Sequence, residues 1–278
     1  MKHFTFKLKE YCDKFSDYPT VRAYIHEEHW EFGNRRYPTV VVLPGGGYCS
    51  TSQREAEPIA VKFFAEGFNT FVLDYTIVGK GQPYPDALRE ACGLIKLIRE
   101  KSEDWGCSDK VSVIGFSAGG HLASMIATQY DSDTVVDFLG AIVKPDACIL
   151  GYPVTTGGEY AHRGSFINMT GSEDVEKHQM LDSSKFVSER TCPVFLFHTA
   201  NDETVPVQNS LLFAKQLADY KVPFECHIYP DGVHGLSLAT EMTCTTDEVC
   251  MINDRFAGWF DDCVKFLQER NLAFKFKK

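Results

Sequence analysis

Apolar positions along the chain recur in two alternating spacings from residue 39 onward. Short apolar runs predict buried β-strands, and the stretches between them repeat apolar residues at the helical spacing. The predicted strands cover residues 39–43, 70–75, 110–116, 147–152, 193–198 and 224–229. The predicted helices cover residues 55–66, 88–101, 118–129, 207–220 and about 254–271. This alternation predicts the α/β fold class, with a mainly parallel central sheet and helices on both faces.

Two segments depart from the alternation. Residues 4–28 switch between polar and apolar positions, which predicts antiparallel edge strands. Residues 155–191 are polar and rich in Gly, Ser, Glu and Lys, with at most a short helix near 175–181. No Pro- or Gly-rich linker marks an independent unit. We therefore predict a single domain over residues 1–278, with residues 155–191 as an insertion that forms a pocket over the end of the sheet.

Composition and charge narrow the class of protein. With 44% hydrophobic and 24% charged residues and no apolar run of about 18 residues, the chain is predicted to be soluble, without a membrane span. The net charge of −10 makes nucleic acid or an anionic membrane an unexpected partner. The N-terminal segment lacks the apolar run of a secretory signal, which predicts a cytoplasmic protein with reduced thiols. The ten cysteines form no C-x-x-C pair, so no zinc site is expected.

A G-x-S-x-G motif lies where the predicted strand at 110–116 gives way to a helix. On such a tight turn the serine is held in a strained conformation, and Gly115 and Gly119 remove the side chains that would collide. The hydroxyl of Ser117 then projects above the sheet at a helix N-terminus, where developing negative charge is favoured. Ser117 is therefore the candidate nucleophile. The alternative is a Gly-rich helix start with a capping serine.

A serine nucleophile needs a base and a third group that orients the base. Asp202 lies just beyond a predicted strand, and His234 lies in a loop beyond the last predicted strand. The chain order of serine, acid and histidine matches that of doubly wound hydrolases. Glu203 is an alternative acid, but it lies one position further into the turn, and we favour Asp202. His198, at the end of its strand, is expected to be a core or pocket-lining residue.

The tetrahedral oxyanion of acyl transfer requires preorganised N–H donors. Ala118, directly after the candidate nucleophile, offers one N–H group, and the glycine run at 45–47 offers others, of which we favour Gly46 and Gly47. A phosphate cradle is the alternative for the glycine run, but the Lys-Ser/Thr of a P-loop is missing. Tyr48 and the insertion around residues 160–166 are expected to line the substrate pocket.

With these residues the sequence resembles the α/β-hydrolase superfamily, and within it the acetylxylan-esterase-like or sugar-ester hydrolase branch. The resemblance extends from about Tyr37 to Leu238. It includes PGGGY at 44–48, REAEP at 54–58, SAGGHLA at 117–123, HTAND at 198–202 and GVHGL at 232–236. It implies an esterase fold with acyl-serine chemistry, often on acetylated sugars. Pro44 stands where hormone-sensitive-lipase relatives carry His, which favours the sugar-ester branch.

We therefore expect a serine carboxylic-ester hydrolase that acts on small acyl, foremost acetyl, esters of xylan fragments or other sugars through an acyl-enzyme intermediate. Neither a cofactor nor a metal is expected. A serine peptidase of the prolyl-oligopeptidase kind and a catalytically silent α/β-hydrolase that serves as a binding module are the alternatives. The oligomeric state stays open, and a homodimer through an edge strand or the terminal helix is one option.

Overall fold

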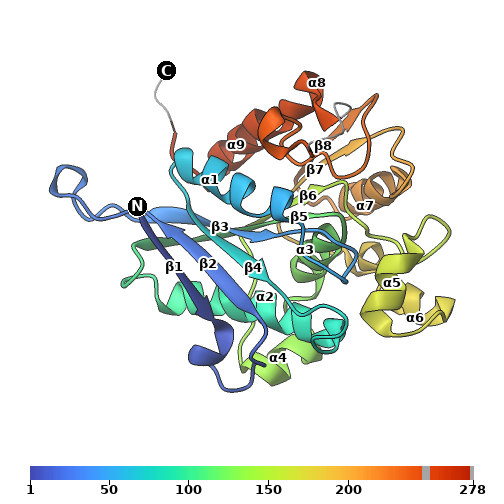
Figure 1. The fold of residues 1–278 in the computed structure, drawn as a ribbon, viewed down its shortest axis with the longest axis horizontal. Coiled ribbons are helices and arrows are strands. Elements are labelled where there is room, and N and C mark those ends of the chain that lie inside the picture. Colours follow the sequence, from blue (N-terminus) through green and yellow to red (C-terminus); the bar gives the residue numbers. More distant parts are fainter. Residues whose placement is uncertain (246–250, 276–278) are drawn as a thin grey trace.

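One twisted sheet forms the centre of the molecule, with its eight strands in the order β1-β2-β4-β3-β5-β6-β7-β8 (Figure 1). The computed structural model describes residues 1–245 and 251–275. The strands are β1 (Lys2–Lys7), β2 (Thr20–Ile25), β3 (Tyr37–Leu43), β4 (Asn69–Asp74), β5 (Cys107–Phe116), β6 (Ala147–Gly151), β7 (Val194–Thr199) and β8 (Phe224–Tyr229). β2 pairs antiparallel with β1 and β4, and all pairs from β4 to β8 are parallel. The predicted α/β class with a mainly parallel sheet is confirmed.

Helices cover both faces of this sheet. They are α1 (Glu57–Ala65), α2 (Pro83–Glu100), α3 (Ser117–Gln129), α4 (Asp133–Leu139), α5 (Arg163–Thr170), α6 (Val175–Met180), α7 (Gln208–Asp219), α8 (Asp254–Ala257) and α9 (Trp259–Glu269). Figure 1 shows α1, α8 and α9 on one face, and α2 and α4 on the other. In β3, Val40 and Val42 join the core beneath α1 and α9, whereas Val41 and Leu43 join the core beneath α2 and α3. Burial on both faces explains the unbroken apolar run of this strand.

The structure differs from the predicted helices in three places. α2 begins at Pro83, earlier than residue 88, with a break in the helical backbone at Tyr84. The predicted terminal helix is divided at Gly258 into α8 and α9. The sequence did not predict α4 or α5, both of which span only two turns or so and are therefore too short for a clear periodic signal.

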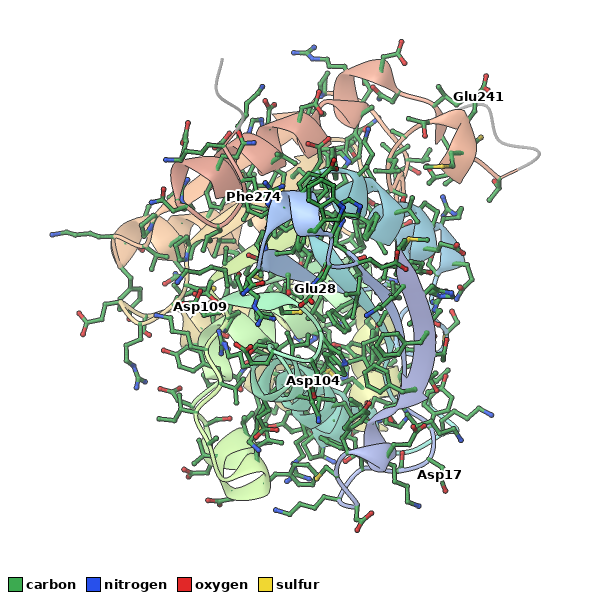
Figure 2. The ribbon with its side chains drawn as sticks, turned by 90° about the vertical axis from the view of Figure 1, so that its left-hand side faces the viewer. Asp17, Glu28, Asp104, Asp109, Glu241 and Phe274 are labelled. Atoms are coloured by element: carbon green, nitrogen blue, oxygen red, sulfur yellow. The ribbon has the colours of Figure 1, made fainter. Side chains whose placement is uncertain are left out.

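Many acidic side chains lie on the surface of the fold. Asp17, Glu28, Asp104, Asp109 and Glu241, labelled in Figure 2, are all exposed. Water solvates the negative charge at these positions, so these carboxylates need no partner in the core. No helix within residues 1–245 and 251–275 combines the length and the apolar character of a membrane span.

The carboxyl ends of β3, β5, β7 and β8 lie at the same edge of the sheet, because these strands run parallel. The loop after β3 carries the glycine run at 45–47, and Ser117 follows β5 directly. Asp202 follows β7, and His234 follows β8. Ligands in open α/β sheets bind in the crevice at this edge. The fold thus brings segments that are far apart in the chain to one place.

Candidate active site

Ser117 occupies a strained turn between β5 and α3. Its φ is 52°, in the left-handed region that residues with a side chain rarely adopt. A Cβ atom on Gly115 would lie 2.1 Å from the carbonyl oxygen of Gly119, and a Cβ on Gly119 would lie 2.1 Å from that of Leu43. Only glycine allows α3 to approach β5 and β3 this closely. The sharp turn predicted from the sequence motif is therefore present.

The structure brings together Ser117, Asp202 and His234. His234 Nε2 lies 2.8 Å from Ser117 Oγ, and His234 Nδ1 lies 2.7 Å from Asp202 Oδ2. Because a carboxylate only accepts hydrogen bonds, Nδ1 carries the proton, and Nε2 of the neutral ring accepts from the serine hydroxyl. Glu203, the alternative acid, has an exposed side chain, and Asp202 is the residue that contacts the imidazole.

The Asp202 carboxylate is buried and well supplied with donors. Its Oδ1 accepts the backbone N–H groups of Thr204 and Val205, each at 2.9 Å. Burial alone would raise the pKa of Asp202, but hydrogen bonding from His198 and His234 outweighs it, and the pKa lies well below its ordinary value. The carboxylate therefore stays anionic and can stabilise a positive charge on His234.

The glycine loop after β3 has a backbone that few other residues could adopt. Gly46 and Gly47 have φ values of 128° and 61°, and a Cβ on Gly46 would lie 2.3 Å from the carbonyl oxygen of Ser50. Asn168 of α5 donates to the Gly47 carbonyl oxygen at 2.8 Å. Ala118, in the first turn of α3, has an N–H group without an intrahelical acceptor. The assignment of Gly46, Gly47 and Ala118 as oxyanion donors stays a prediction that this geometry allows.

The side chain of Tyr48 is placed differently from the expectation. It is fully buried, and its hydroxyl lies 3.0 Å from His121 Nδ1 on α3. Tyr48 therefore supports the glycine loop from beneath and does not line an open pocket in this structure. The reason is its φ of 59°, which turns the chain after Gly47 and directs the side chain into the core.

Glu55 is a buried carboxylate that sequence reasoning did not single out. It is 3% exposed, and its Oε2 accepts the N–H of Gly45 at 2.8 Å. Its Oε1 accepts the hydroxyl of Tyr152 at 2.6 Å, and that hydroxyl accepts the N–H of Ser237 at 2.9 Å. The Tyr152 ring lies edge-on to the His234 ring, with centroids 5.0 Å apart. Glu55 therefore connects the glycine loop to the segment that carries the histidine.

The segment at 155–191 reaches the same region through α5. Ser165 Oγ lies 2.8 Å from His162 Nδ1, and a Cβ on Gly47 would lie 3.9 Å from Ser165 Oγ. The pKa of His162 is lowered, first by burial and then by the nearby His234. Together with the Asn168 contact, these observations place α5 against the glycine loop.

A polar pocket of about 470 Å³ lies beside His234. Its lining consists of Asn201, Glu203, Thr204, Asp231, Gly232, Val233, His234 and Asn253. Amides, carboxylates and hydroxyls dominate this wall, and Val233 is its apolar member. Within the residues that the structure describes, no group of three or more His, Cys, Asp or Glu side chains is arranged to hold a metal ion.

Replacing Glu55 with alanine should lower the free energy of unfolding by about 2–4 kcal/mol, because the N–H of Gly45 and the hydroxyl of Tyr152 lose a buried acceptor. Glu57→Ala is the matched control, since Glu57 is exposed in the first turn of α1 and should cost less than about 1 kcal/mol. Denaturant titration measures both variants. Equal stability of the two would contradict the bridging role of Glu55.

Comparisons with known proteins match the chain to one family and to several relatives. A family model described as BD-FAE matches residues 30–217. The chain is 34% identical to endo-1,4-beta-xylanase B of Butyrivibrio fibrisolvens over 87% of its own length, and 27% identical to an acetylxylan esterase of Xylanibacter ruminicola over 72%. It spans 36% and 41% of the length of these two curated relatives.

A solved structure is similar over most of both chains. It is an acetyl ester-xyloside bifunctional hydrolase from Caldicellulosiruptor lactoaceticus, with 35% sequence identity and a TM-score of 0.77. The similarity covers 92% of this chain and 89% of that chain. The family match spans the glycine loop, the strained serine turn and the aspartate, and the chain belongs to the BD-FAE family of α/β hydrolases.

Proposed function

We propose that the protein is a serine esterase that hydrolyses small acyl esters, foremost acetyl esters of xylan fragments or other sugars. The observation that carries this proposal is the continuous hydrogen-bonded chain from Ser117 Oγ through His234 to Asp202. The relatives named as an acetylxylan esterase and as an acetyl ester-xyloside hydrolase support the acetyl group and the xylan-derived alcohol.

Each of the three hydrogen-bonded residues has a defined task in this reaction. His234 Nε2 accepts the Ser117 proton while Oγ attacks the ester carbonyl carbon, and Asp202 stabilises the imidazolium that forms. The N–H groups of Gly46, Gly47 and Ala118 are the proposed donors to the oxyanion. The leaving alcohol then takes the proton from His234. Water next attacks the acyl carbon while His234 Nε2 accepts its proton, and that proton passes to Ser117 Oγ as the C–O bond breaks and the carboxylic acid leaves.

The polar pocket beside His234 supports an alcohol with several hydroxyl groups. The leaving oxygen must depart within reach of His234 Nε2, which supplies its proton. The adjacent wall of the pocket is lined by Asn201, Glu203 and Asp231. Their side-chain oxygens can accept hydrogen bonds from sugar hydroxyls, and the Asn201 amide can also donate to them. A lipid alcohol would leave these polar groups without partners.

Substrate preference is tested with p-nitrophenyl acetate, butyrate and octanoate and with acetylated xylo-oligosaccharides, scored by kcat/KM. We expect the acetyl ester to exceed the octanoyl ester by about tenfold or more, and Ser117→Ala to abolish turnover. A preference for octanoate would contradict the acetyl assignment. A folded protein that hydrolyses none of these esters would contradict the esterase function itself.

Asp202→Asn should lower kcat by about 10⁴-fold without unfolding the protein. The amide oxygen can still accept from the N–H groups of Thr204 and Val205, and this orientation points the amide NH₂ at His234 Nδ1. Nδ1 must then accept, so Nε2 carries the proton and cannot serve as the base. Glu203→Gln on the neighbouring residue is the comparison and should lower kcat on p-nitrophenyl acetate far less, because Asp202 is the residue that contacts the imidazole. Steady-state kinetics measure both, and a larger loss in Glu203→Gln would identify Glu203 as the acid.

A further inference from the structure

A second imidazole lies against the Asp202 carboxylate. His198, in β7, is fully buried, and its Nε2 lies 3.3 Å from Asp202 Oδ2, the same oxygen that His234 Nδ1 contacts. Nε2 also lies 3.0 Å from the carbonyl oxygen of Val205, and Nδ1 lies 2.8 Å from Ser210 Oγ of α7. Asp202 is therefore enclosed between two histidines, one in β7 and one in the loop after β8.

The partners of His198 determine where its proton lies. The Val205 carbonyl and the Asp202 carboxylate only accept hydrogen bonds, so Nε2 must carry a hydrogen and share it between them. Nδ1 then accepts from the hydroxyl of Ser210. A neutral ring in this tautomer satisfies every polar atom of the side chain, which is the usual requirement for a fully buried group.

We propose that His198 is a positioning residue for the reaction, and this inference rests on the proposed esterase function. Its Nε2–H approaches Asp202 Oδ2, holds the carboxylate in the plane that His234 requires and draws part of its negative charge away from His234. Thr204 and Val205 hold the other oxygen. With both oxygens held, rotation of the carboxylate would break contacts on both sides.

Loss of the His198 donor has two consequences. The Asp202 carboxylate gains rotational freedom, so a smaller fraction of molecules has His234 aligned with Ser117, which lowers kcat. The full negative charge of Asp202 then acts on His234 and favours its protonated form, so the acidic limb of the kcat/KM profile moves to higher pH. A change confined to core packing would not produce the second effect.

The other charged groups around His234 are not substituted in these variants, and they include Glu203 and Asp231 in the lining of the pocket beside it. Asp202 contacts it from the loop after β7, and His162 faces it from the segment before α5. Glu55 accepts the hydroxyl of Tyr152, and the ring of Tyr152 contacts the His234 ring. Arg54 donates to the carbonyl oxygen of the next residue, Gly235, at 2.8 Å. Of these groups Asp202 is the one that His198 contacts, so a shifted profile would report this contact.

The test compares His198→Phe, His198→Gln and His198→Asn with the wild type on p-nitrophenyl acetate. The Gln amide nitrogen reaches about as far as Nε2, whereas the Asn amide nitrogen reaches only as far as Nδ1. We expect Phe and Asn to lower kcat by about 10-fold to 100-fold at nearly unchanged KM, with the acidic limb raised by about 0.5 pH unit, and Gln to restore most of both. His227→Phe, in the neighbouring strand β8, is the matched control and should change neither.

Either of two kinetic outcomes would overturn the proposal: a folded Phe or Asn variant with the wild-type kcat and profile, or a lower kcat with an unmoved acidic limb. If the Phe variant fails to fold, the Gln and Asn pair decides alone, because both are neutral amides. A pH titration of the downfield proton resonance of the His234–Asp202 hydrogen bond tests the same shift without substrate. A shifted resonance in a protein without esterase activity would sustain the contact while contradicting the proposed function, and an unshifted one would overturn the role of His198.

Discussion

The close crossing of α3 over the ends of β3 and β5 is the constraint on which the site depends. The carbonyl oxygens of Leu43 and Gly119 occupy the places where Cβ atoms would otherwise lie, so the crossing requires glycine at 115 and 119. In return, Ser117 is held at a φ of 52°, a conformation that costs about 1–3 kcal/mol and persists only when the surroundings enforce it. The buried packing of α3 against β5 and β6 supplies that enforcement.

Two buried carboxylates organise the loops that meet at this serine, and they do so in different ways. Asp202 accepts from backbone N–H groups and from imidazoles, which keeps it ionised and directs its charge at His234. Glu55 accepts from Gly45 and Tyr152 and joins loops that follow different strands. Both groups are costly to bury without donors, so each holds its neighbours in the one arrangement that supplies them. This arrangement preorganises the hydrogen bonds that run from Ser117 through His234 to Asp202.

The sequence carried enough information to predict the sheet and the three side chains that the structure brings together. Strand runs and helical periodicity are local signals. Ser117, Asp202 and His234 each lie in a turn or loop that follows a strand, and a parallel sheet gathers these loops at one edge. Glu55 was not predicted, because its partners Gly45 and Tyr152 are brought to it only by the fold. The burial of Tyr48 follows from a left-handed backbone at a residue that is not glycine, for which no sequence pattern exists. The short helices α4 and α5 both pack against α2, a contact that a window of seven or eight residues does not reveal.

The most direct test of the central claim is covalent labelling with a fluorophosphonate, followed by peptide mass spectrometry. This reagent reacts with a serine that a neighbouring base activates, and it requires no knowledge of the natural ester. The account predicts one adduct, on Ser117, that disappears in Ser117→Ala and forms far more slowly in His234→Ala. A folded protein that stays unlabelled, or that carries its adduct on another serine, would contradict it.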